Sequence, residues 1–209
     1  MDIPADFADL LARGRHPLGA PVELHLGADS GPFAELAELL SHTNGFTIAN
    51  GGVQVFRAGT EGLGPELAEW NEPSLWKDTY GELAADLFCF GQDLFGVQFA
   101  VSGDRVVSFD PETAERTNLG GSLADWMSWL AADLELNAAK GFATDWQDRH
   151  GPLGYRERLL PVRPFVLGGK FDEANLVARD AVYCMRVRGP IAQKVHGLPD
   201  GAEVRLHTD

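Results

Sequence analysis

The stretch Asp86–Asp110, "DLFCFGQDLFGVQFAVSGDRVVSFD", decides the fold. It contains three apolar runs, each rich in Phe and Val and of the length of a typical strand. Two polar steps, Gly91–Asp93 and Ser102–Asp104, separate the runs and predict tight turns. In the first step, we expect Gly91 to supply backbone freedom and Asp93 to fix the turn with its side chain. Strands joined by such short turns are antiparallel, so the stretch predicts a meander at the centre of a sheet.

The residues before this stretch predict helices and a hairpin. Every second residue of 21–27 is apolar, which indicates a strand with one buried face. Ser30 is the expected N-cap of a helix. Pro73 divides a later helical pattern into two pieces and leaves Trp70 and Trp76 to pack inward. In chain order we expect a helix at 2–13, a strand at 21–27, a helix at 30–45, a hairpin turning at Asn50–Gly52 and a broken helix at 64–83.

The residues after the meander predict one more helix and a second, smaller unit. A polar connection follows the meander, and a helix then runs from its cap at Ser122 to its end at Gly141. Further on, we expect a strand with a Gly-Gly turn, a helix that begins at Pro190, and a terminal strand. The expected fold is α+β, with a central, mostly antiparallel sheet flanked by helices in residues 1–140. Residues 141–209 are expected to form a C-terminal α/β subdomain packed against it.

Charge is distributed unevenly along the chain. The net formal charge is −14, and residues 1–140 hold 22 Asp and Glu against 7 Lys and Arg. Residues 141–209 hold 9 Asp and Glu against 10 Lys and Arg. Because a phosphate backbone requires a basic face, this composition argues against nucleic acid as a direct ligand. The acidic field of the first unit is suited to attract a basic partner, and it also favours solubility.

The sequence also bears on location and on the two cysteines. No apolar run approaches the roughly 18 residues that cross a bilayer, and the N-terminal stretch is acidic where a signal peptide is basic. We therefore expect a cytoplasmic protein without a membrane partner. Cys89 and Cys184 lie in apolar stretches far apart in the sequence, which predicts two buried thiols rather than a disulfide.

Motifs for catalysis or cofactor binding are weak. The six histidines lack the short spacings of zinc sites, and no glycine-rich segment has the spacing of a phosphate loop. We therefore expect no metal, no cofactor and no enzymatic activity. One alternative stays open, because four aspartates recur near predicted strand ends, where carboxylates could pair as in a hydrolase. Turn formation explains the same residues, since Asp hydrogen-bonds the backbone two residues on. They are Asp86, Asp93, Asp104 and Asp110.

Short motifs in the first two thirds of the chain occur in a characteristic order. They are "LLSHTNGF", "VQVF", "DLFCFGQDLFGVQFAV", "RVVSFDPET" and "LADWMSWL". Together they resemble the SUKH superfamily, whose best-known branch is the Smi/Knr type, over Pro32–Leu134. In that family an Asn-Gly pair follows the first helix and an F-G-x-D…F step joins two central strands. Asn44-Gly45 and Phe90–Phe95 stand in those places here, whereas the tail after Lys140 has no counterpart.

The resemblance implies a binding protein rather than an enzyme. SUKH proteins are α+β domains without shared catalytic residues, and many bacterial members are immunity proteins that neutralise a toxin domain. We therefore expect stoichiometric binding of a cognate toxin, and the acidic face favours a basic one. A regulatory scaffold that binds an endogenous enzyme is the alternative, and the oligomeric state stays open. Candidate partner-binding residues are Asp86, Asp93, Asp104, Asp110, Glu112, Glu115, Trp70 and Trp76.

Overall fold

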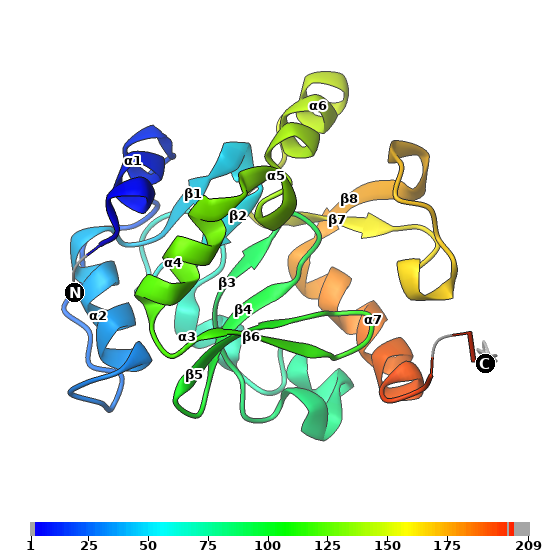
Figure 1. Cartoon of the computed structure of the whole chain (residues 1–209), viewed down its shortest axis with the longest axis horizontal. Helices are drawn as coiled ribbons and strands as arrows, with labels where there is room; N and C mark the ends of the chain where they lie inside the picture. The colour runs from blue at the N-terminus through cyan, green and yellow to red at the C-terminus, as the bar shows by residue number, and fades with distance from the viewer. Residues whose placement is uncertain (1–2, 200, 203–209) are drawn as a thin grey trace.

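The computed structural model describes residues 3–199 and 201–202, and it has an α+β fold around a six-stranded antiparallel sheet (Figure 1). The strands follow one another across the sheet in chain order, as a meander. They are β1 Phe46–Ile48, β2 Val53–Val55, β3 Phe88–Asp93, β4 Gln98–Ser102, β5 Arg105–Phe109 and β6 Arg116–Gly120. The expected fold class is therefore confirmed, and β3, β4 and β5 are the predicted central strands.

Three helices cover one face of the sheet around a single tryptophan. The ring of Trp126 packs against Phe7 and against Phe90 and Phe99, which come from β3 and β4. Aromatic pairs of this kind add to the large apolar area that each ring buries. The helices are α1 Ala5–Arg13, α2 Pro32–His42 and α4 Leu123–Ala132.

The opposite face carries a chain of aromatic rings. Trp70 contacts Trp76, Trp76 contacts Tyr80, and Tyr80 contacts Phe109 of β5. Phe109 is paired with Gln98, the neighbour of Phe99, so it points away from the Trp126 face. The predicted break at Pro73 is confirmed, although the second piece consists of 3-10 turns. The elements are α3 Leu67–Asn71, η2 Lys77–Thr79 and η3 Gly81–Ala84.

The segment after the predicted division at residue 140 packs into both cores of the molecule. Its elements are α6 Lys140–His150, β7 Glu157–Pro161, η4 Phe165–Leu167, η5 Glu173–Asn175, β8 Leu176–Asp180 and α7 Ala181–Val195. β7 and β8 form an antiparallel pair. Met185 of α7 is buried in the main core, whereas Leu94 from the sheet unit packs with Trp146 and Leu159 in a smaller core. Side chains from before and after residue 140 therefore pack together in both cores.

The strand predicted at 21–27 is wrong. Its residues alternate between half-buried and exposed, as the pattern indicated, and Val22, Leu24 and Leu26 pack against the main core. The segment nevertheless forms no ladder with any strand among the described residues. An extended segment shows alternating burial whenever one of its faces lies on an apolar surface. The pattern therefore does not indicate whether another strand is hydrogen-bonded to the segment.

Two helix boundaries differ from the prediction. Gly31, not Ser30, is the N-cap of α2, at φ 76°, and no side chain caps that helix. Ser122 caps α4 as expected, by accepting a hydrogen bond from Asp125 N. That helix ends at Ala132, because Asp133 caps a separate short helix, α5 Leu134–Asn137. Gly141, the predicted end, lies inside α6.

Two further elements of the second half correct the prediction. The polar connection after β5 contains β6, an edge strand whose first three residues are exposed and therefore lack the apolar alternation of a buried strand. Helix α7 begins at Ala181 and tolerates Pro190 in its interior, with Asp180 as its N-cap. The predicted terminal strand lies outside the described residues.

The step Gly91–Asp93 is part of β3 and not a turn. A β-bulge follows Cys89, and a Cβ on Gly91 would lie 2.7 Å from the backbone oxygen of Gln54, so glycine permits close strand approach there. The chain turns one residue later, because Asp93 Oδ1 accepts hydrogen bonds from Phe95 N and Val97 N, both at 2.8 Å. The structural role predicted for Asp93 is correct, whereas that for Gly91 is not.

Candidate functional sites

The exposed acids among the predicted contacts lie in different settings. Arg116 Nη2 lies 2.6 Å from Asp86 Oδ1, and Ser102 Oγ donates to Asp86 Oδ2 at 2.8 Å. The hydrogen bond from Arg116 lowers the pKa of Asp86 to about 2. Asp86 is therefore a paired group that joins β6 to the start of β3. Asp104 in the β4–β5 turn and Glu115 before β6 are exposed.

Trp70 and Trp76 are not surface anchors. They are 2% and 0% exposed. Trp70 Nε1 donates to Gln98 Oε1 at 2.8 Å, and Trp76 Nε1 donates to the backbone oxygen of Trp70 at 2.9 Å. The prediction that they pack inward is confirmed, and their proposed role as exposed partner contacts is wrong.

Asp110 and Glu112 line a common cavity of about 320 Å³, which we call the phenylalanine pocket. Its walls come from the turn after β3, the turn after β5, and the segment that connects β7 to β8. The apolar lining residues are Phe95, Val97, Pro111, Phe165, Val166 and Phe171, and the polar ones are Asp110, Glu112, Thr113 and Arg188. Asp110 and Glu112, two of the predicted contact residues, thus line a pocket that is mostly apolar.

Both carboxylates of this pocket are held by backbone N–H groups. Asp110 Oδ1 accepts hydrogen bonds from Glu112 N and Thr113 N, which is the turn chemistry expected of Asp. Glu112 is 4% exposed, and its Oε2 accepts from Val166 N at 2.9 Å. Its Oε1 is buried without a partner among the described residues. Burial raises the pKa of Glu112, and the hydrogen bond from Val166 opposes that shift.

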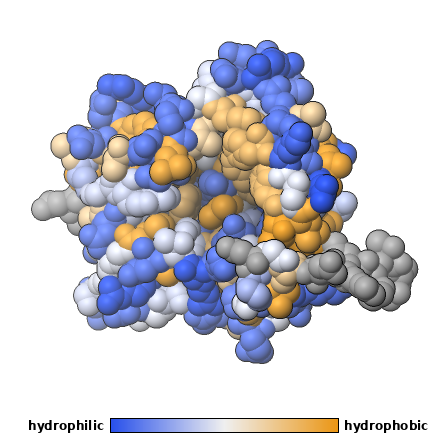
Figure 2. All heavy atoms as spheres, turned by 45° about the vertical axis from the view of Figure 1, so that its right-hand side comes forward, coloured by the Kyte–Doolittle hydropathy of each residue, from blue (hydrophilic) through white to orange (hydrophobic). Residues whose placement is uncertain are grey.

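An exposed apolar patch continues from the phenylalanine pocket. Phe171 is 60% exposed and packs against Phe95, Phe142 and Phe165. Figure 2 shows apolar side chains gathered on the face turned toward the viewer, around a hollow. Val162 and Val166 are exposed as well. Contiguous apolar surface of this kind on a monomer marks interaction sites for proteins or ligands.

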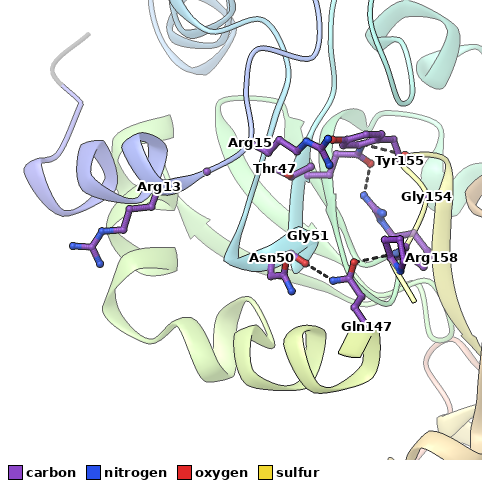
Figure 3. A pocket seen from close by; sticks show the side chains of 13 residues that line it. Arg13, Arg15, Thr47, Asn50, Gly51, Gln147, Gly154, Tyr155 and Arg158 are labelled. Atoms are coloured by element: carbon purple, nitrogen blue, oxygen red, sulfur yellow. Dashed lines mark hydrogen bonds between the residues drawn. The ribbon is translucent and has the colours of Figure 1, made fainter. Parts of the chain in front are cut away.

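A second cavity, of about 440 Å³, has the opposite character, and we call it the arginine pocket. It lies between the end of α1, the β1–β2 hairpin, α6 and the segment that leads into β7 (Figure 3). None of its lining residues is acidic. They are Arg13, Gly14, Arg15, Thr47, Asn50, Gly51, Gln54, Gln147, Pro152, Leu153, Gly154, Tyr155 and Arg158.

A row of buried glutamines begins at the arginine pocket, where Gln54 is a lining residue. Gln54, Gln92 and Gln98 are paired across β2, β3 and β4 and are fully buried. Gln54 Oε1 accepts hydrogen bonds from Gln92 Nε2 and from Arg158 Nη2. Gln54 Nε2 donates to the backbone oxygen of Tyr155. Buried amides need such partners, so the C-terminal segment completes the hydrogen bonding of the Gln54 side chain.

The two cysteines and the possible metal ligands form no further site in the part of the chain that the structure describes. Cys89 and Cys184 are free and buried, as predicted, and burial raises their pKa values to about 12 and about 11. Within residues 3–199 and 201–202, no three His, Cys, Asp or Glu side chains come together in a way that could hold a metal ion. None of the described helices combines the length and apolar character that crossing a membrane requires.

Sequence reasoning identified the two acids of the phenylalanine pocket and missed its aromatic walls. Phe95 and Phe171 are 76 positions apart, and their contact depends on how the C-terminal segment folds back. The arginine pocket was missed entirely, because Arg15 and Arg158 are far apart in the sequence. The one available signal was the concentration of Lys and Arg in residues 141–209, which hold 10 of the 17, beside an acidic first unit.

Comparison with known proteins supports the fold. No protein-family model matches the chain, and no curated protein matches it significantly. A solved structure, the crystal structure of Atu4351 from Agrobacterium tumefaciens, is similar with a TM-score of 0.51 and 14% identity, over 88% of each chain. Residues 1–140 are too few to supply that coverage, so the similarity extends into the C-terminal segment. At this identity it is a similarity of fold.

Proposed function

We propose that the protein is a cytoplasmic immunity protein of the SUKH type, which neutralises a basic toxin domain by stoichiometric binding. The observation that carries this proposal is the phenylalanine pocket, an apolar hollow with Asp110 and Glu112 in its wall and exposed Phe171 beside it. Interface hot spots form where an aromatic or arginine anchor enters a desolvated pocket. A basic partner residue with an apolar neighbour fits this combination.

Charge complementarity supports the same partner chemistry. Glu112 has a buried carboxylate oxygen that no described residue satisfies, and an arginine or lysine from a partner would supply the missing donor. The net charge of −14 of the whole chain would speed the approach of a basic protein. The sequence resemblance over Pro32–Leu134 points to the same class of function.

The test is co-expression with a toxin-like reading frame that adjoins this gene. The proposal predicts rescue of growth and a one-to-one complex, with affinity that falls as salt is raised. Absence of both rescue and complex would overturn it, and recovery of an endogenous enzyme instead would favour the scaffold alternative.

Variants locate the contact surface within that experiment. Phe171→Ala removes an exposed ring, and we expect an affinity loss on the order of tenfold to a hundredfold, typical of a central interface residue. Leu136→Ala is the matched control, because Leu136 is an apolar residue, 80% exposed, that does not line the pocket. Equal affinity of the two variants would exclude the phenylalanine pocket as the contact.

A carboxylate hydrolase is the second candidate, because Asp110 and Glu112 line one pocket and burial raises the pKa of Glu112. A raised pKa suits a general acid. Glu112→Gln separates the two candidates, since the amide keeps the oxygen that accepts from Val166 N but cannot transfer a proton. Hydrolysis would be abolished, whereas toxin neutralisation would persist with weaker binding.

A further inference from the structure

We infer that the arginine pocket binds a small molecule bearing a phosphate or carboxylate group. This site is separate from the phenylalanine pocket, and the inference does not depend on the proposed function. The pocket volume, about 440 Å³, falls in the range of small-molecule sites. The argument rests on Arg15, Arg158 and Tyr155, none of which donates a hydrogen bond to a carboxylate in the described part of the chain.

Arg15 is the accessible cation. Backbone hydrogen bonds tie it to β1, because Arg15 N donates to Thr47 O at 2.8 Å and Thr47 N donates to Arg15 O at 2.9 Å. Its guanidinium lies over the ring of Tyr155, 5.2 Å from the ring centroid. No ion pair joins Arg15 to an acid in the described part of the chain. The stack with Tyr155 orders the guanidinium and leaves its edge available to an oxyanion.

Arg158 is the buried cation. It is 2% exposed, and its Nη1 and Nη2 donate to the backbone oxygen of Glu157 and to Gln54 Oε1. Its Nε has no partner among the described residues. Both acceptors are neutral, and the carboxylate of Glu157 is engaged by Gly154 N instead. Burial lowers the pKa of Arg158 to about 10, against the attraction of Asp93.

Tyr155 contributes a third unsatisfied donor. Its Oη is buried without a hydrogen-bond partner among the described residues. A buried hydroxyl or guanidinium that lacks its partner costs free energy, which a bound acceptor recovers. Tyr155, Arg158 and Arg15 all line this cavity, so an oxyanion bound in it would meet Arg15 at the mouth and would accept from donors of the cavity wall. The planar carboxylate group and the tetrahedral phosphate group each present two oxygens that a guanidinium group can bind together.

Arg13 provides a built-in control. It lines the same cavity, but Arg13 Nη2 lies 2.6 Å from Asp9 Oδ2, and its side chain points away from the others (Figure 3). Arg13→Ala therefore removes the same charge as Arg15→Ala from the same segment, without removing a proposed ligand contact. Tyr155→Phe removes only the hydroxyl and keeps the ring beneath Arg15.

The experiment measures thermal unfolding of the full chain with three probes: inorganic phosphate, adenosine monophosphate and citrate, at constant ionic strength. At a probe concentration about 100-fold above its dissociation constant, a chain of this size should gain on the order of 5–10 °C. Stabilisation by citrate alone would identify a carboxylate ligand. Stabilisation by adenosine monophosphate more than by inorganic phosphate would identify a phosphate ester.

The variants decide whether the arginine pocket is the site. We expect Arg15→Ala and Tyr155→Phe each to weaken probe binding about tenfold, the effect of one lost hydrogen bond to a charged group, and Arg13→Ala to leave it unchanged. Titration calorimetry provides the dissociation constants. The inference is overturned if no probe stabilises the wild-type chain, or if Arg13→Ala weakens binding as much as Arg15→Ala does.

Discussion

The phenylalanine pocket and the arginine pocket are built from the same two parts of the chain and have opposite chemistry. Each takes one wall from the sheet unit and the other from the segment after residue 140. In the first, the sheet unit supplies both acids and Phe95, and the C-terminal segment supplies Phe165 and Phe171. In the second, both parts supply arginines, and no lining residue is acidic. The contrast teaches that one packing interface can form two cavities with different chemistry.

Asp93 connects the two pockets electrostatically. Its carboxylate fixes the turn after β3, and its negative charge attracts both Arg158 of the arginine pocket and Arg188 of the phenylalanine pocket. Arg188 in turn donates to the backbone oxygen of Phe95 at 2.7 Å. A substitution of Asp93 should therefore affect both pockets, whereas a substitution within one pocket should affect that pocket alone.

The largest loss of stability is expected from Leu159→Ala. This variant tests whether both pockets depend on the packing of the smaller core. Leu159 is fully buried in the smaller core, and Leu159 N donates to the backbone oxygen of Leu94. Truncation of such a residue costs about 2–5 kcal/mol of unfolding free energy. Urea denaturation measures the loss, and anion binding and partner binding should weaken together. Leu136→Ala, on the exposed α5, should change stability by less than about 0.5 kcal/mol.

Asp93→Asn should change how stability depends on pH. Burial raises the pKa of Asp93 to about 6, so the folded state holds this proton more tightly than the unfolded chain does. The wild type should therefore lose roughly 2–3 kcal/mol of unfolding free energy from this group as pH rises from about 4 to about 6 and above. Asn keeps the oxygen that accepts from Phe95 N and Val97 N but does not titrate.

Urea denaturation at pH 4.5 and pH 7 measures this difference. We expect Asp93→Asn to be the more stable protein at pH 7 and to differ least from the wild type at the lower pH. A variant destabilised equally at both values would show that turn geometry, and not the charge, dominates at this position.

A smaller effect is expected at Gly96, in the wall beside Arg188. Its φ is +82°, and an added Cβ would lie 2.6 Å from Arg188 Nη2. Gly27 has a similar φ of +78° with no atom within 4 Å of the same position. Both alanine variants incur the left-handed strain, so their difference isolates the displacement of Arg188. We expect Gly96→Ala to cost about 1–2 kcal/mol more, because Arg188 would lose its bond to Phe95 O.

The parts of this molecule that sequence patterns predicted are those set by local chemistry. The Ser122 cap, the hairpin at Asn50–Gly52 and the three central strands all depend on residues near one another in the chain. Strand β6 was missed because an exposed edge strand carries no apolar alternation. The phenylalanine pocket and the arginine pocket were missed because tertiary packing brings their residues together from distant parts of the sequence. Asp110 and Glu112 were found for their charge, although the apolar surface around them was not foreseen.

The smallest effect is expected at Asp86, and it separates a structural acid from a partner contact. The hydrogen bond from Arg116 lowers the pKa of Asp86 to about 2, so its contribution to stability is present above the ordinary value near 4 and is lost as pH falls toward 2. Because the pair is partly exposed, solvent screens it, and Asp86→Asn should cost only about 0.5–1 kcal/mol at pH 7.

Glu82→Gln is the matched control, since Glu82 is an exposed acid nearby with no ion pair in the described part of the chain. Both substitutions remove one negative charge from the same region and should slow partner association equally. Only Asp86→Asn should lower the unfolding free energy in urea. If Asp86→Asn instead weakened partner binding well beyond Glu82→Gln without loss of stability, Asp86 would be a contact residue, and the binding surface would extend away from the phenylalanine pocket.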